Sequence, residues 1–103
     1  MKVSLADDGT IRLLGRFDAR AAAAVREALH GELAAGRPRV VVDLAGVELL
    51  DVTGLGVLVG AHRRARLQGT ELVLRNAPPR VARLLYRIRL DRVIPVERLS
   101  IPA

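Results

Sequence analysis

Three aspartates stand where predicted strands end or predicted helices begin. Asp18 follows a strand, Asp43 ends another strand, and Asp51 precedes a helix. The carboxyl ends of parallel strands meet at one edge of an open α/β sheet, and such an edge usually holds the functional site. We therefore expect the three carboxylates to gather at that edge. A structural role is expected as well, because aspartate is a preferred N-cap and both Asp18 and Asp51 are placed to cap helices.

Two phosphate-handling sites are disfavoured by the residue pattern. A magnesium and aspartyl-phosphate pocket of the response-regulator kind needs adjacent acids after the first strand and a later lysine. Here Asp7 and Asp8 lie before the second strand, and the only lysine is Lys2. A Walker-type phosphate loop needs a lysine after its glycines, which the Gly54-Leu55-Gly56 segment lacks.

The sequence also lacks the residues that catalysis and metal binding usually need. The chain has no cysteine, and its only serines, Ser4 and Ser100, lie near the two ends. His30 and His62 lie on predicted helices without a ligand partner at useful spacing, which is typical of ordinary surface or boundary histidines. We therefore expect a non-enzymatic protein with no catalytic residue, no metal site and no cofactor.

The segment LDVTGLG at residues 50–56 is the most informative stretch. It places the hydroxyl of Thr53 at a helix start, between an acid and a pair of glycines. Thr53 is either a simple cap or an exposed hydroxyl open to a kinase, since a helix N-terminus tolerates a phosphate. Gly54, Gly56 and Gly60 allow either close packing of the helix on a sheet or a flat surface for a partner.

Turn signals divide the chain into elements in the order ββαβαβαβ. Strands are predicted at residues 3–5, 10–16, 39–44, 71–74 and 92–95, with residues 45–50 as a connection. Helices are predicted at 19–35, from about 51 to 67 and from about 78 to 88. Helical crossovers between strands imply an α/β fold with a mixed, mainly parallel sheet and an N-terminal hairpin.

The apolar residues of these elements predict the core. The β-branched run at 39–44 predicts a strand buried on both faces, with Val41 packed beneath Leu55 or Leu58. Helical spacing predicts two further apolar stripes: Ala22, Val25, Leu29 and Leu33, then Val81, Leu84, Leu85 and Ile88. On the third helix Arg80, Arg83 and Arg87 are expected to face solvent.

Composition narrows the class of protein further. The 103 residues, half of them hydrophobic, suit one domain spanning 1–103. The net charge of +6 raises the possibility of nucleic-acid binding, with the basic excess confined to residues 63–103. However, Phe17 and Tyr86 are the only aromatic residues, so single strands have no stacking platform. No apolar run reaches membrane-spanning length, and we expect a cytoplasmic monomer without membrane or nucleic-acid partners.

Several of these segments together resemble one known family. Residues 41–47 (VVDLAGV), followed by 51–56 (DVTGLG), resemble the signature of STAS domains, the sulfate-transporter and anti-sigma-factor-antagonist domains. Residues 15–18 (GRFD) resemble the family's element before the first helix, and 90–96 (LDRVIPV) its usual ending. The resemblance covers nearly the whole chain in order, and it is greatest to stand-alone bacterial anti-sigma factor antagonists.

This resemblance implies a protein-interaction switch. Thr53 occupies the phosphorylated position, and Asp18 and Asp51 match the acids beside it. The implied partners are an anti-sigma factor serine/threonine kinase and a serine/threonine phosphatase, with binding of the kinase freeing a sigma factor. The implied docking surface is Asp18 with residues 51–59, centred on Asp51, Val52, Thr53, Gly54, Leu55 and Gly56.

The sequence departs from the family at three places, and two alternatives stay open. Val52 stands where serine is frequent, Arg16 replaces a frequent glutamate, and the short end at 97–103 leaves little room for a final helix. One alternative is a STAS accessory subunit of a transporter or of a stress-sensing assembly. The other is a basic nucleic-acid-binding domain.

Overall fold

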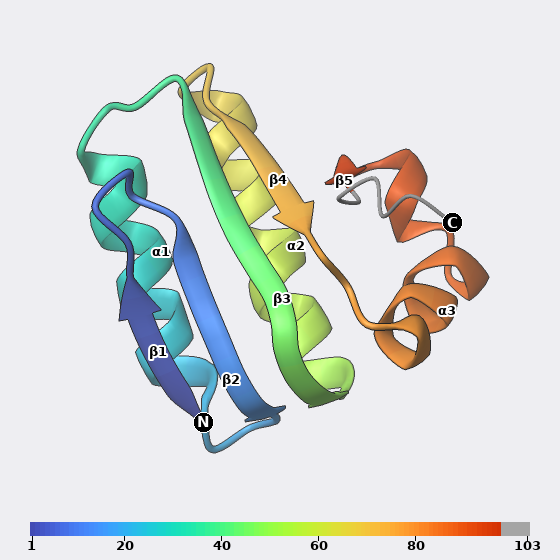
Figure 1. Cartoon of the computed structure of the whole chain (residues 1–103). Helices are drawn as coiled ribbons and strands as arrows, with labels where there is room; N and C mark the ends of the chain where they lie inside the picture. The colour runs from blue at the N-terminus through green and yellow to red at the C-terminus, as the bar shows by residue number, and fades with distance from the viewer. Residues whose placement is uncertain (98–103) are drawn as a thin grey trace, which may run out of the picture.

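The computed structural model describes residues 1–97. The prediction that the end at 97–103 has little room for a final helix therefore concerns residues that, apart from Glu97, lie outside the described part. Within these described residues, five strands form one sheet in the order β1-β2-β3-β4-β5 (Figure 1). The strands are β1 (Lys2–Leu5), β2 (Ile11–Phe17), β3 (Arg39–Leu50), β4 (Glu71–Arg75) and β5 (Val96–Glu97). The helices are α1 (Ala22–Ala34), α2 (Val52–Leu67), α3 (Pro79–Arg87) and the short 3₁₀ helix η1 (Leu90–Arg92).

Strand pairing confirms the predicted topology. β1 and β2 form an antiparallel hairpin, whereas β2–β3, β3–β4 and β4–β5 are parallel pairs. Each parallel pair is joined by a crossover that contains a helix, as parallel connections require. The result is the mixed, mainly parallel α/β sheet that the element order predicts.

One face of the sheet carries the hydrophobic core. α1 and α2 lie side by side behind the sheet in Figure 1, and they cover the face presented by alternate residues of β2 and β3. Ile11, Leu13 and Phe17 of β2 are fully or almost fully buried there. The apolar stripe of α1 packs against this face as predicted, through Ala22, Val25, Leu29 and Leu33.

The prediction that β3 is buried on both faces is wrong. Val40, Val42 and Leu44 are buried in the core, whereas Val41 between them is only half-buried. Alternation along the strand turns Val41 to the opposite face, so it does not lie beneath Leu55 or Leu58. No helix crosses the front of β1, β2 and β3 in Figure 1, and this explains the incomplete burial.

Several predicted boundaries are also wrong. Residues 45–50 are not a connection but continue β3, because β2 runs on to Phe17 and pairs with them. α1 begins at Ala22 rather than Ala19, and its N-cap is Ala21 with no side-chain cap. At the C-terminal end the strand lies at Val96–Glu97 instead of 92–95, after the 3₁₀ turn of η1. Ile88 ends α3 as a C-cap residue and is 46% exposed, so it lies outside the predicted apolar stripe.

Candidate functional site

The start of α2 is organised by Asp51. This residue follows β3 directly in extended conformation, and its carboxylate accepts a hydrogen bond of 2.9 Å from the Gly54 backbone N–H. Its carbonyl accepts the first helical bond, from Leu55 N at 2.9 Å. Asp51 is therefore the N-cap that the sequence predicts, and its side chain satisfies one of the donors that a helix start leaves open.

The end of β2 lies against this helix start. The Asp51 backbone N–H donates to the carbonyl of Phe17 at 3.3 Å, and Phe17 pairs with Leu50 in the sheet. Asp18 follows Phe17 directly, so the sheet brings Asp18 to the same edge as Asp51. Asp18 does not cap α1, however; its carboxylate accepts from Arg20 N at 3.0 Å and closes a turn ahead of that helix.

The three glycines of α2 have different environments. A Cβ on Gly54 would lie 2.7 Å from Leu50 Cδ1 and 2.8 Å from the Phe17 carbonyl oxygen, so only glycine fits there. Gly56 and Gly60 have open space where a Cβ would be. Close packing of the helix on the sheet therefore explains Gly54 alone, whereas Gly56 and Gly60 help to line a small hollow between α1 and α2.

The remaining predicted site residues form the exposed surface of this helix start. Val52 is 83% exposed, and Thr53 and Gly56 are exposed beside it. Leu55 is half-buried and packs against the core. An apolar side chain as exposed as Val52 offers contact area to a partner without any cost to the core.

Thr53 is more exposed than the other serines and threonines among residues 1–97. Thr10 and Thr70 are buried, and Ser4 is half-buried in β1, whereas Thr53 is exposed. The Thr70 hydroxyl is also engaged, since it donates to the Arg37 carbonyl at 3.2 Å. A kinase approaching the described part of the chain thus meets Thr53 as the most accessible serine or threonine.

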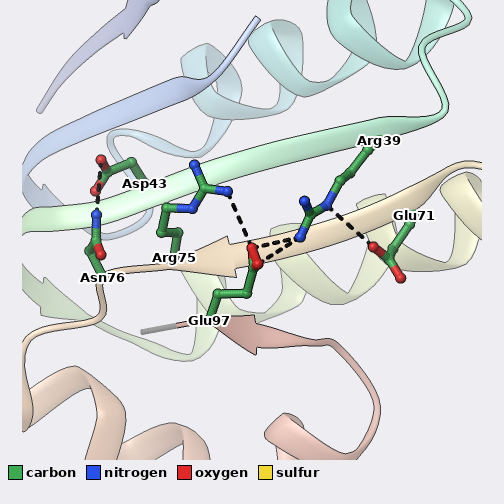
Figure 2. A network of polar contacts seen from close by, with 6 residues as sticks. All are labelled: Arg39, Asp43, Glu71, Arg75, Asn76 and Glu97. Carbon is green, nitrogen blue, oxygen red and sulfur yellow. Dashed lines mark hydrogen bonds and ion pairs between the residues drawn. The ribbon is translucent and has the colours of Figure 1, made fainter. Parts of the chain in front are cut away.

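Asp43 does not join this edge, which corrects the expected cluster of three carboxylates. It lies within β3, eight residues before Asp51, or roughly 26 Å along an extended strand. Its carboxylate accepts from Ala45 N at 2.9 Å and from the Asn76 side chain at 3.4 Å (Figure 2). Asp43 therefore bonds within β3 and to Asn76 just after β4, and only Asp18 and Asp51 belong to the candidate site.

The described residues also hold no cluster of three or more histidines and acids that would suit a metal ion. His62 is buried in α2, and burial is the main cause that lowers its pKa from the ordinary value. His30 is exposed on α1 and contacts Arg64 of α2. The surface position expected of a histidine is thus confirmed for His30, whereas His62 is buried. No described helix has the length and apolar character needed to cross a lipid bilayer.

One supporting residue was missed at the sequence level. Phe17 contributes its carbonyl to Asp51 and its ring to the packing around Gly54. Its signals in the sequence were its aromatic side chain and its place in the GRFD segment before Asp18, and neither indicates a contact with Asp51 or Gly54. Contacts of this kind join segments more than thirty residues apart, and no local pattern reveals them.

Fold and site geometry together define a STAS domain. The family model described as "Mlab, STAS domain" matches residues 1–96, and the chain belongs to this family. It is 36% identical over 90 residues to an anti-sigma-B factor antagonist of Listeria monocytogenes, covering 87% of this chain and 79% of that protein. An anti-sigma-B factor antagonist of Bacillus subtilis is 32% identical over 94 residues, covering 91% and 85%.

Solved structures agree on the fold. The crystal structure of an anti-sigma factor antagonist from Mycobacterium paratuberculosis superimposes with a TM-score of 0.74 at 27% identity, over 92% of this chain and 81% of that one. Unphosphorylated SpoIIAA, an anti-sigma factor antagonist, gives 0.77 at 18% identity, over 96% and 87%. The predicted family and fold are therefore confirmed.

Proposed function

We propose that this protein is an anti-sigma factor antagonist whose binding is switched by phosphorylation of Thr53. The observation that carries the proposal is the exposure of Thr53 in the first turn of α2, between the Asp51 cap and the open space at Gly56. The relatives named anti-sigma-B factor antagonist, which align over most of the chain, support the same function.

The partner is an anti-sigma factor that is itself a serine/threonine kinase. It docks on Asp18 and the exposed start of α2, where Val52 and Thr53 offer apolar and polar contacts and Gly56 leaves the helix backbone open to approach. The sigma factor is released because the antagonist occupies its inhibitor. The protein acts in the cytoplasm as a binding partner and kinase substrate, and it requires no cofactor of its own.

The modification step is an ordinary phosphoryl transfer. The Thr53 hydroxyl oxygen bonds to the γ-phosphorus of ATP, the bond from that phosphorus to the bridging oxygen of ADP breaks, and the hydroxyl proton is released. A metal-dependent phosphatase reverses the switch by hydrolysis, returning the hydroxyl and inorganic phosphate. Every catalytic group for these steps belongs to the partner enzymes.

Charge explains why the phosphate controls binding more than folding. It adds about 1.5–2 negative charges, which the helix N-terminus alone favours by roughly 0.3–1 kcal/mol. The Asp51 carboxylate is two residues away, and a like-charge pair at about 5 Å and an effective dielectric near 20 costs on the order of 3 kcal/mol before screening. In the free protein the exposed phosphate turns away into water. A docked partner excludes that water, so the penalty falls on binding.

The test compares affinity-tagged Thr53→Ala and Thr53→Glu proteins as baits in lysate of the source cell, with mass spectrometry of what they retain. We expect Thr53→Ala to retain a kinase-type anti-sigma factor and Thr53→Glu to retain about tenfold less of it. Ser4→Glu, in β1, is the matched control that adds the same charge away from α2. The retained kinase with ATP should then modify Thr53, as mapped by intact mass and peptide sequencing.

Two results would overturn the proposal. Retention of transporter subunits instead of an anti-sigma factor would assign the chain to the accessory-subunit role. Phosphorylation at another residue, with kinase binding unchanged by Thr53→Glu, would remove Thr53 from the switch.

A further inference from the structure

The C-terminal half of β3 has a free edge. β4 pairs with residues 39–43 of β3 and then ends, whereas β2 continues alongside β3 as far as Leu50. On the side away from β2, no strand within residues 1–97 pairs with residues 45–50. Figure 1 shows β3 continuing past the tip of β4, with α3 beside that open end. An unpaired edge of this kind is a template for an added strand.

A groove runs between this edge and α3. It has a volume of about 420 Å³, within the range of natural binding sites. One wall comes from Glu48, Leu49 and Leu50 of β3, and the other from Arg80, Val81, Arg83, Leu84 and Arg87 of α3. Leu50 and Val81 are buried, while Leu49 and Leu84 remain partly exposed. The groove therefore combines apolar walls with an unpaired strand edge.

The charge of the groove is strongly positive. Arg80, Arg83 and Arg87 lie on one side of α3 at positions i, i+3 and i+7, and Glu48 is the only acid among the described residues that line the groove. None of the three arginines takes part in an ion pair among residues 1–97; Arg83 donates only to the Pro79 carbonyl, at 3.3 Å. Arg80 and Arg87 are about 10 Å apart along the helix axis, the length of three residues of extended chain.

We propose that this groove binds an extended acidic segment of a partner protein. The segment adds to the free edge of β3 as a strand, and its carboxylates pair with Arg80, Arg83 and Arg87. A peptide satisfies both features, because it carries main-chain donors and acceptors for the edge as well as carboxylates for the arginines. A nucleic acid or a free phosphate would meet the arginines and leave the strand edge unpaired.

The groove is distinct from the switch surface. It ends at Leu50, immediately before the Asp51 cap, and its lining does not include Thr53. The inference thus goes beyond the proposed function and does not require that the acidic segment belong to the anti-sigma factor. Its test uses the purified protein alone, so failure here leaves the phosphorylation switch untouched.

The probe is a fluorescein-labelled ten-residue peptide of alternating valine and glutamate, titrated with the full chain and followed by fluorescence anisotropy. We expect saturable binding that weakens about tenfold or more in the Arg80→Gln, Arg83→Gln, Arg87→Gln triple variant. The matched control is Arg12→Gln, Arg20→Gln, Arg63→Gln, which removes three exposed arginines outside the groove and should shift affinity by less than about twofold. Thermal melting verifies that both variants are folded.

Two further readouts separate strand addition from simple charge attraction. Hydrogen exchange of the amides in residues 45–50 should slow when the peptide is bound, and N-methylation of alternate peptide residues should abolish binding. Equal losses in the two triple variants, or unchanged exchange at 45–50, would overturn the proposal. So would tighter binding of a random DNA duplex than of the peptide at the same salt concentration, since that result assigns the arginines to nucleic acid.

Discussion

Arg39 in β3 and Glu97 in β5 form hydrogen bonds with each other across β4, the strand that lies between them. One guanidinium nitrogen of Arg39 donates to both carboxylate oxygens of Glu97, at 2.6 and 2.7 Å, and Arg75 of β4 donates to the same carboxylate at 3.2 Å (Figure 2). These hydrogen bonds, that from Arg39 first, lower the pKa of Glu97 from its ordinary value of 4.5. The contact fastens the two-residue strand β5 to the sheet.

This relationship predicts a pH-dependent contribution to stability. Because the pKa of Glu97 is lowered in the folded state, the contact stabilises the fold above the ordinary carboxyl pKa. That contribution is lost as the pH falls through the lower folded-state value. Glu97→Gln should therefore lower the urea midpoint at pH 7, and the difference from the parent protein should shrink towards pH 3. Glu27→Gln, on the exposed side of α1, is the control; a deficit for Glu97→Gln that is equal at both pH values would contradict the assignment.

The different burial of two adjacent valines in β3 predicts very different losses of stability when each is replaced by aspartate. Val42 is fully buried, and Val42→Asp should destabilise the domain by several kcal/mol, enough to unfold it, because the charge has no partner in the core. Val41→Asp adds the same charge on the half-buried opposite face, where about 1 kcal/mol is expected. Urea titration of both variants measures the contrast. Similar losses would mean that the alternation assigned to β3 is wrong.

The sequence predicted the type and order of the elements because each carries a local periodicity. The sequence did not predict which face of the sheet Val41 occupies, because a run of three valines is compatible with a strand buried on one face and with a strand buried on both. It also missed the continuation of β3 through residues 45–50, which depends on pairing with β2 rather than on local propensity. Gly46 in that stretch indicates a turn when only the sequence is considered. In the structure it lies within β3, against the Leu14 side chain of β2.

The sequence predicted those parts of the candidate site that depend on local signals and missed those that depend on strand pairing. The Asp51 cap is a local signal, with its acceptor and donor only three residues apart, and it is confirmed. The grouping of Asp43 with Asp18 and Asp51 assumed that β3 ends at residue 44, and the longer strand carries Asp51 away from Asp43. The groove beside α3 depends on where β4 ends relative to β3, which only the tertiary structure reveals.

Gly54 and Gly56 should respond in opposite directions to the same added methyl group. Gly54→Ala places a Cβ against Leu50 and the Phe17 carbonyl, so a loss of roughly 1–3 kcal/mol is expected. Gly56→Ala meets open space on an exposed helix, and the reduced freedom of the unfolded chain should stabilise it by about 0.5–1 kcal/mol. Thermal or urea unfolding checks both. A destabilised Gly56→Ala protein would show that its surface is already covered.

Asp51 has two separable roles, and two substitutions distinguish them. Asn is as good an N-cap as Asp, so Asp51→Asn should keep stability within about 0.5 kcal/mol, whereas Asp51→Ala loses the bond to Gly54 and costs about 0.5–2 kcal/mol. Asp51→Asn also removes the negative charge beside a phosphate on Thr53. The proposed switch predicts an affinity loss of about tenfold on phosphorylation of the parent protein, and this loss should become several-fold smaller in Asp51→Asn.

The measurement is the Kd for the anti-sigma factor of phosphorylated and unphosphorylated protein in both backgrounds, at two salt concentrations. Repulsion between the Thr53 phosphate and the Asp51 carboxylate predicts a loss that salt reduces in the parent and reduces much less in Asp51→Asn. An unchanged loss in Asp51→Asn would show that the phosphate blocks docking by its size. The cap would then serve the helix alone, and the open space at Gly56 would be the feature that the partner requires.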